Sequence, residues 1–182
     1  MTYSCKYCSE EVKEKKCYSD GDYCPYFPKQ DLPKRLVGVS DISLLEESLR
    51  QKCLYNSLSE VLNVNSNFTT WFNYVVKFRD VCDSLERFNK ECSYKIMQEL
   101  EIETRLIDEC VLSSFVSRGN VQTDNKILRD DRAFAEKLGI VIHPAISINN
   151  MTYRGDINGY DIFRAVCVGF SKAPEVCEGD NI

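Results

Sequence analysis

Histidine, basic runs and long apolar runs are the features that this sequence has least of. His143 is the single histidine among 182 residues, so metal sites that combine cysteine with histidine are nearly excluded. The net charge is -5 and no cluster of basic residues could neutralise a phosphate backbone, which argues against a nucleic-acid partner. No apolar run approaches the roughly 18 residues that cross a bilayer, so we expect no membrane contact by this chain itself.

The first residues are not expected to act as a secretory signal sequence, because Met1 leads directly into polar residues. Ten cysteines nevertheless run along the whole chain, and only Cys5 and Cys8 form a Cys-x-x-Cys pair. Without a second pair at ligand spacing, disulfides explain this count better than a metal site does. Disulfides persist in an oxidising compartment. The sequon at Asn67, an expected glycosylation site, fits such a compartment. We therefore expect a fragment of a longer protein, located in the secretory or endomembrane lumen or at the cell surface.

Eight of the cysteines are expected to form disulfides. The spacing favours three local bridges, which are Cys17–Cys24, Cys82–Cys92 and Cys167–Cys177. The first pair encloses "YSDGDY", which must turn, and the two wider spacings leave room for a turn between the partners. Cys53 and Cys110 are also expected to be bonded, with no partner assigned to either.

Three segments of different character follow one another. Residues 1–33 are a cysteine-rich N-terminal segment, within which "YSDGDYCPYFP" is expected to form loop and turn. Residues 34–139 carry apolar residues at helical spacing and predict five helices. The helices are expected from Ser40 through Cys53, from Thr69 or Thr70 to Cys82, and over about 85–100, 105–112 and 123–138. Residues 140–182 form a β-hairpin and a closing helix at about 157–170.

Two of these predicted helices carry further expectations. The stripe of Trp71, Tyr74 and Phe78 lies on one helical face and is expected in the core. In the last helix of the block, Ile127, Phe134 and Leu138 are expected to point inward, and Gly139 supplies the C-terminal stop.

The hairpin is predicted from "HPAISINNMTYRG", residues 143–155. Ile146 and Ile148 alternate with polar residues, which is typical of a half-buried strand. Asn149-Asn150 is a turn pair, and a second strand is expected to begin at Tyr153. Asp156 is then expected to cap the closing helix.

A proline before a strand, a tight hairpin and a closing helix are typical of the C-terminal half of a thioredoxin-like domain. "HPAISINNMTYRGDINGYDIFRAVCVGF" and "CYSDGDYCPYFPKQDL" resemble the central luminal domain of vacuolar sorting receptors. "LRQKC", "TWFNYVVKF", Cys82, Cys92 and "IDEC" follow in the order and spacing of that family. The fold expected from this resemblance is α/β: an incomplete thioredoxin-like domain with a large helical insertion, rich in disulfides.

The resemblance implies a receptor domain that binds soluble luminal cargo for delivery to a vacuolar or lysosomal compartment. It places the chain in the Golgi, a prevacuolar or a lysosome-related compartment, and places a membrane span elsewhere in the full-length protein. His143 and Pro144 are expected to form a binding edge for a partner chain, with Pro144 in the cis form. We expect no catalytic residue, cofactor or metal.

Two alternatives remain beside the receptor. One is a luminal thiol-disulfide oxidoreductase that uses Cys5 and Cys8, since a Cys-x-x-Cys pair at a helix start has a lowered thiol pKa. Against it, we expect no strand before Cys5, and the residues after Cys8 offer few apolar positions for docking a helix. The other is a structural segment in a larger assembly.

Overall fold

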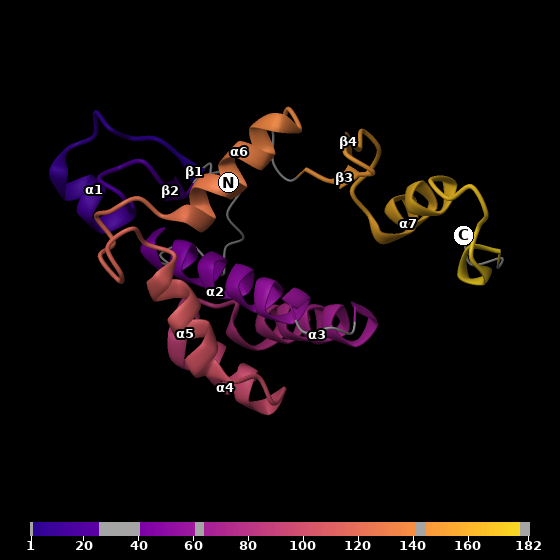
Figure 1. The fold of residues 1–182 in the computed structure, drawn as a ribbon, viewed down its shortest axis with the longest axis horizontal. Coiled ribbons are helices and arrows are strands. Elements are labelled where there is room, and N and C mark those ends of the chain that lie inside the picture. Colours follow the sequence, from indigo (N-terminus) through magenta and orange to yellow (C-terminus); the bar gives the residue numbers. More distant parts are fainter. Residues whose placement is uncertain (1, 26–40, 61–63, 141–144, 179–182) are drawn as a thin grey trace. The chain divides into compact units, whose positions relative to one another are not determined.

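The computed structural model describes residues 2–25, 41–60, 64–140 and 145–178 (Figure 1). The chain forms two compact units, residues 1–131 and 132–182. Its described part is mixed α/β: helices predominate, and each of two small antiparallel sheets has two strands. None of the described helices has the length and apolar character that a membrane span requires. The division at residues 33 and 139 stays a prediction.

The N-terminal segment contains two short strands and a helix. Strand β1 (Thr2–Tyr3) pairs with β2 (Cys24–Pro25), and helix α1 (Glu10–Lys16) lies between them in the sequence. A strand therefore precedes Cys5 and a helix follows Cys8. The prediction that this pair lacks both neighbours is wrong.

Charges explain why α1 forms although it has few apolar residues. Glu10 and Glu11 lie in its first turn and lysines in its last turn, which complements the helix dipole. Lys15 Nζ lies 2.7 Å from Glu11 Oε1, one turn earlier. None of its residues is buried, so local pairs rather than core packing stabilise this helix.

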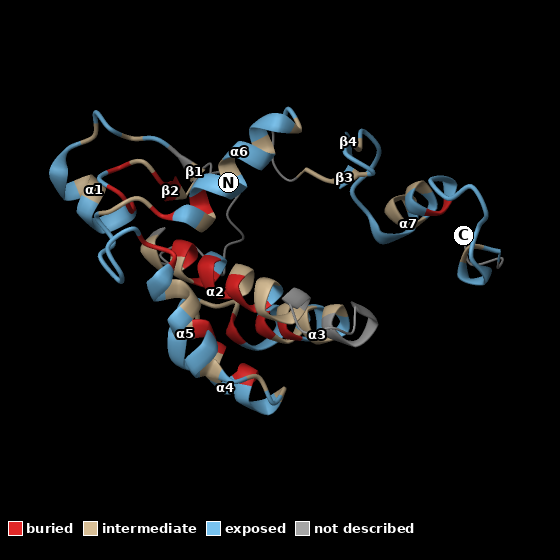
Figure 2. Ribbon diagram, in the orientation of Figure 1, coloured by how far each residue is buried: buried red, intermediate tan, exposed pale blue. Residues whose placement is uncertain are grey.

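Four helices build most of the first unit: α2 (Asp41–Glu60), α3 (Val64–Cys82), α4 (Lys90–Glu99) and α5 (Thr104–Ser113). Helix α2 packs against both α3 and α5, and α4 packs against α3 and α5. Figure 2 shows that the buried residues gather on the sides where these helices meet.

Two apolar clusters contain residues from different parts of α2. The larger lies among the four helices and includes Leu54, Tyr74, Phe78, Met97 and Ile107. The smaller joins α2 to the N-terminal segment and to the start of α6 (Lys126–Lys137), and consists of Tyr18, Tyr23, Leu45, Leu49, Phe115 and Leu128. The predicted aromatic stripe is confirmed as core, because Tyr74 and Phe78 are buried in the larger cluster and the partly buried Trp71 packs against that cluster.

Two predicted helix starts are wrong. Helix α3 begins at Val64, so Thr69 and Thr70 lie inside it rather than at its cap. Helix α4 begins at Lys90 instead of Leu85, because the Asn89 side chain accepts a hydrogen bond from the backbone N–H of Cys92 at 2.9 Å.

Helix α6 (Lys126–Lys137) ends where the sequence predicts. Gly139 has a φ of +65°, and the N–H groups of Gly139 and Ile140 donate back to Glu136 and Ala135, as in a Schellman motif. Ile127 packs against both clusters. Phe134, expected to point inward, is 57% exposed.

The second unit contains the predicted hairpin and closing helix. Strands β3 (Ser147–Ile148) and β4 (Met151–Thr152) pair, and Asn149 and Asn150 have φ of 52° and 63°, as a type I′ turn requires. The second strand thus begins two residues before Tyr153. Helix α7 (Gly159–Val168) is capped by Asn158 rather than Asp156, and a 3₁₀ turn at Glu175–Cys177 follows.

All ten cysteines are paired in five disulfides. The structure joins Cys17 to Cys24, Cys82 to Cys92 and Cys167 to Cys177, and it joins Cys53 to Cys110 and Cys5 to Cys8. The chain is therefore disulfide-rich, as the cysteine count indicates.

Candidate functional site

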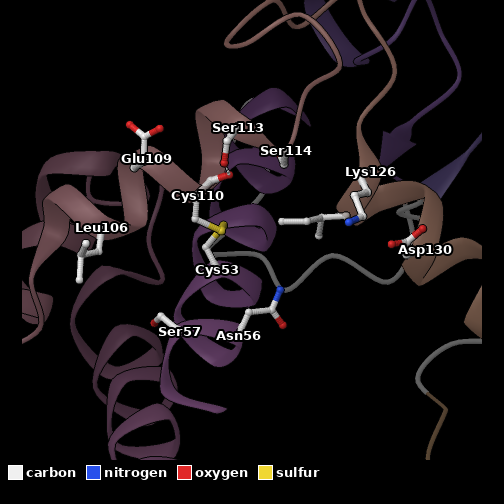
Figure 3. Close-up of a pocket in the computed structure, with 11 residues that line it drawn as sticks. Cys53, Asn56, Ser57, Leu106, Glu109, Cys110, Ser113, Ser114, Lys126 and Asp130 are labelled. Carbon is white, nitrogen blue, oxygen red and sulfur yellow. Dashed lines mark hydrogen bonds between the residues drawn. A yellow bond between two sulfur atoms is a disulfide. The ribbon is translucent and has the colours of Figure 1, made fainter. Parts of the chain in front are cut away.

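A cavity of about 690 Å³ opens between α2, α5 and the start of α6. Figure 3 shows the lining side chains from these helices around the Cys53–Cys110 disulfide. The lining comes from three stretches of the sequence: Cys53, Asn56 and Ser57; Leu106, Glu109, Cys110, Ser113 and Ser114; Lys126, Ile127 and Asp130.

Buried polar contacts fix the start of α6 beside the end of α5. Asn125 is fully buried, and its Nδ2 donates to Ser114 Oγ at 2.7 Å. Its Oδ1 accepts from the backbone N–H of Leu128 at 3.1 Å, which satisfies one free donor at the helix start. The backbone N–H of Lys126 donates to the carbonyl of Ser114 at 2.8 Å. The Lys126 wall of the cavity is therefore anchored to its α5 wall.

The lining suits a ligand that has both polar and apolar groups. Leu106 and Ile127 provide apolar surface, and Glu109, Lys126 and Asp130 provide charge of both signs. Glu109 also pairs with Arg118 outside the cavity. Such a mixture offers hydrogen-bond donors and acceptors beside apolar contacts, as protein-binding surfaces do.

The three serines of the lining all donate to main-chain carbonyls. Ser57 Oγ donates to the carbonyl of Leu54 at 2.8 Å, Ser113 Oγ to that of Cys110 at 3.1 Å and Ser114 Oγ to that of Val111 at 2.7 Å. None of these hydroxyls is paired with a side-chain base, which nucleophilic activation would need. Within residues 2–25, 41–60, 64–140 and 145–178, no group of three or more potential ligands could hold a metal ion.

Among the predicted site residues that the structure describes, one pair meets in this cavity, namely Cys53 and Cys110. The predicted binding edge, His143 and Pro144, lies outside the described residues, and so does the expected cis bond. Asn67 lies in α3, but its side chain is outside the described part, so its glycosylation stays a prediction.

The Cys5–Cys8 pair lies apart in the sequence from every residue of the cavity, in the connection from β1 to α1. The backbone N–H of Cys5 donates to the carbonyl of Gly21 at 2.7 Å, and that of Cys8 donates to the carbonyl of Cys5 at 2.9 Å. These contacts hold the pair in a tight turn beside the Ser19–Gly21 loop.

Sequence reasoning missed a buried polar network next to the larger cluster. The Tyr74 hydroxyl donates to Glu47 Oε1 at 2.7 Å and lies 2.7 Å from Ser93 Oγ, and Arg50 Nε donates to Glu47 Oε2 at 2.9 Å. Burial, and next the Glu47 charge, raise the pKa of Tyr74. A signal was available, because Glu47 and Arg50 interrupt the apolar side of α2 beside Leu45 and Leu49.

Comparison with known proteins gives one consistent family. A family model described as the vacuolar sorting receptor thioredoxin-like domain matches residues 1–167. Vacuolar-sorting receptor 1 of Pisum sativum is 27% identical over 191 residues, which cover 100% of this chain and 29% of that protein. Vacuolar-sorting receptor 4 of Arabidopsis thaliana is 29% identical over 168 residues, with 88% and 25% covered. The chain thus spans less than a third of the length of these relatives.

Proposed function

The chain belongs to the vacuolar sorting receptor family, and from this premise we propose that it is part of a luminal receptor that binds soluble proteins and directs them to a vacuolar or lysosomal compartment. The match of residues 1–167 to the family's thioredoxin-like domain carries this proposal. Its relatives are named vacuolar-sorting receptors, which supports a role in the endomembrane system. Five disulfides agree with an oxidising lumen.

We further propose that cargo contacts the cavity at the Cys53–Cys110 disulfide. Lys126 and Asp130 offer opposite charges one turn apart on α6, and Leu106 offers an apolar contact across from them. A short extended segment of a cargo protein could satisfy both kinds of group. The disulfide and the Asn125 contacts keep the walls in place, so little conformational freedom is lost on binding.

The test alters this segment within the full-length receptor, in the cells that produce it. The readout is the amount of soluble hydrolases secreted into the medium, measured by quantitative mass spectrometry. Deleting residues 1–182 tests the sorting role, and Ser113→Trp tests the cavity, because its bulk fills the opening from α5. Gln98→Trp, at an exposed position of α4, is the matched control.

We expect secretion to rise several-fold with the deletion and with Ser113→Trp, and to stay unchanged with Gln98→Trp. Unchanged secretion after the deletion contradicts the sorting role. A rise with the deletion but not with a folded Ser113→Trp protein keeps the sorting role and contradicts the cavity.

Binding without catalysis is also part of the proposal, and the oxidoreductase remains the second candidate. One observation favours the latter: Cys5 and Cys8 lie between a strand and a helix. Against it, Glu10 and Glu11 follow the pair after one serine, and negative charge near a thiol disfavours its thiolate form. An insulin-reduction assay decides, because a clear rate that Cys5→Ser abolishes would establish the oxidoreductase.

A further inference from the structure

A second cavity, of about 200 Å³, lies in the first unit between the N-terminal segment, α2 and α5. We infer that it binds a primary carboxamide carried on a small apolar group, as in a glutamine or asparagine side chain. Its interior holds buried donors that lack acceptors, its edge holds a carboxylate, and its wall is apolar. This inference rests on the geometry of the cavity and does not depend on the proposed cargo function.

Arg50 supplies the first unused donors. The residue is 5% exposed, and its Nε donates to Glu47 Oε2 at 2.9 Å. Its Nη1 lies 3.8 Å from Glu46 Oε2, which is beyond hydrogen-bond distance. Among the described residues, the terminal amino groups of Arg50 therefore donate no hydrogen bond, although they belong to a buried cation that lines the cavity.

Tyr18 supplies the next donor. It is also 5% exposed, its ring meets that of Phe115 edge to face at 5.4 Å, and its backbone pairs with Tyr23. Within the described part of the chain, its hydroxyl has no hydrogen-bond partner. Burial raises the pKa of this hydroxyl, so it stays protonated and able to donate.

These donors point into the cavity rather than into protein. No described side-chain polar atom is both fully enclosed and without a hydrogen-bond partner. The terminal groups of Arg50 and the Tyr18 hydroxyl must therefore reach open space, and the space that both residues line is this cavity. A buried donor that is left unpaired is costly, so the cavity favours an occupant with an acceptor oxygen.

The charges around the cavity favour a neutral occupant over an anion. Lys90 Nζ lies 2.8 Å from Asp108 Oδ1, so these two charges offset each other. The buried Arg50–Glu47 pair is likewise balanced, which leaves the half-exposed Glu46 carboxylate as the excess charge at the edge. A carboxylate would be repelled by Glu46. A carboxamide accepts from Arg50 and Tyr18 through its oxygen and donates to Glu46 through its NH₂ group.

The rest of the lining sets the size and character of the attached group. Val111, Leu112 and Val121 join Phe115 in an apolar wall. A space of this volume holds a group about as large as one amino-acid side chain. A branched aliphatic amide therefore matches the cavity in size, polarity and charge.

Three probes with the same branched five-carbon skeleton test the inference by NMR titration of the whole chain: isovaleramide, isovalerate and isopentylammonium. We expect isovaleramide to bind most tightly and to shift the signals of Tyr18 and Phe115. A blocked tripeptide with a central glutamine, compared with its glutamate counterpart, shows where the carboxamide comes from. If the natural ligand is a protein side chain, the glutamine tripeptide binds. If the natural ligand is a small free amide, isovaleramide binds and the tripeptide does not. Tighter binding of isovalerate or isopentylammonium, or no binding of any probe, overturns the inference.

Two variants locate the site. Tyr18→Phe removes a hydroxyl with no described partner, so the fold is kept, and isovaleramide binding should weaken about 5-fold. Glu46→Gln removes the excess charge, and the preference for isovaleramide over isovalerate should fall about 5-fold. Glu109→Gln, at the other cavity, is the matched control and should change neither value. A folded Tyr18→Phe protein with unchanged affinity, or a Glu46→Gln protein with unchanged preference, contradicts the site.

Discussion

Single polar residues inside the helical core show how much an enclosed hydroxyl depends on its partners. Tyr74 and Ser93 are fully buried and Glu47 is 3% exposed. A buried carboxylate is tolerated only where hydrogen bonds and opposite charge compensate its lost hydration. Tyr74, Arg50 and Gln51 all donate to Glu47. Tyr74 is therefore both a core aromatic and an essential donor to a buried charge.

Replacing Tyr74 by phenylalanine keeps the ring and removes this donor. We expect Tyr74→Phe to lower the free energy of unfolding by about 2 kcal/mol, because the Glu47 carboxylate loses a hydrogen bond that water cannot replace. Urea unfolding followed by circular dichroism measures the change. Tyr18→Phe is the matched control, since that hydroxyl has no described partner, and it should cost less than about 0.5 kcal/mol. Equal losses in the two variants would contradict the role assigned to the Tyr74 hydroxyl.

Asp108 makes the free energy of unfolding depend on pH. Burial alone would raise the pKa of its carboxyl, but hydrogen bonds from Lys90 and Tyr94 and the nearby positive charges lower it below the usual 3.8. A lowered folded-state pKa means that the contribution is complete above 3.8 and is lost as the pH falls below that value.

We expect Asp108→Asn to lower the free energy of unfolding by about 0.5 to 1 kcal/mol at pH 7, a small loss because the carboxyl is partly exposed. The difference from the parent chain should shrink at about pH 3, below the ordinary 3.8, because the unfolded chain then binds a proton more readily than the folded carboxyl does. Urea unfolding at the two pH values measures it. Asp131→Asn breaks an exposed ion pair with Lys52 and should change little at either pH. A loss that stays constant with pH would exclude the charge as its cause.

Helices and their crosslinks explain most of what holds the first unit together. The Cys53–Cys110 bridge joins α2 to α5 across 57 residues, whereas Cys5–Cys8 closes a turn of three. A crosslink stabilises mainly by restricting the unfolded chain, so the longer loop contributes more. The bridge also fixes the two main walls of the larger cavity.

We expect the double variant Cys53→Ala/Cys110→Ala to lose about 4 kcal/mol of unfolding free energy, and Cys5→Ala/Cys8→Ala only about 1.5 kcal/mol. Guanidinium unfolding of each variant under non-reducing conditions gives both values. The N-terminal variant is the control, because it removes the same atoms without opening a long loop. A larger loss in the control would contradict the loop-length argument.

Apolar periodicity in the sequence predicted the helices that bury an apolar face. It did not predict helices, or helix starts, that depend on charge or on side-chain capping. The Trp71 to Phe78 stripe was found in this way. Helix α1 was missed because its dipole and ion pairs, not apolar spacing, stabilise it. The start of α4 was placed too early because the Asn89 side chain competes with the backbone and sets the cap. Apolar spacing does not report on either effect.

At the scale of the whole molecule, the cavities were beyond the reach of sequence patterns. The larger one combines residues 53–57, 106–114 and 126–130, whose meeting depends on how α2, α5 and α6 pack. The sequence instead predicted a binding edge at His143 and Pro144 from a resemblance in one hairpin. Short patterns report local structure, whereas a binding site depends on contacts between distant segments.

The disulfides divide the molecule in the same way as its two compact units. Four bridges lie wholly within residues 1–131 and Cys167–Cys177 lies within residues 132–182. With all ten cysteines paired, no covalent crosslink joins the two units apart from the backbone itself.

A protease recognition sequence inserted after Ile140 should therefore release two fragments that separate on a denaturing gel without any reductant. The same sequence inserted after Glu86 is the control, because Cys53–Cys110 and Cys82–Cys92 both span that position. Its fragments should stay joined until reductant is added. If the fragments cut after Ile140 remain joined without reductant, a bridge crosses between the units, and the pairing of Cys167 with Cys177 is wrong. If the control fragments separate without reductant, the two bridges that stabilise the helical block are not formed.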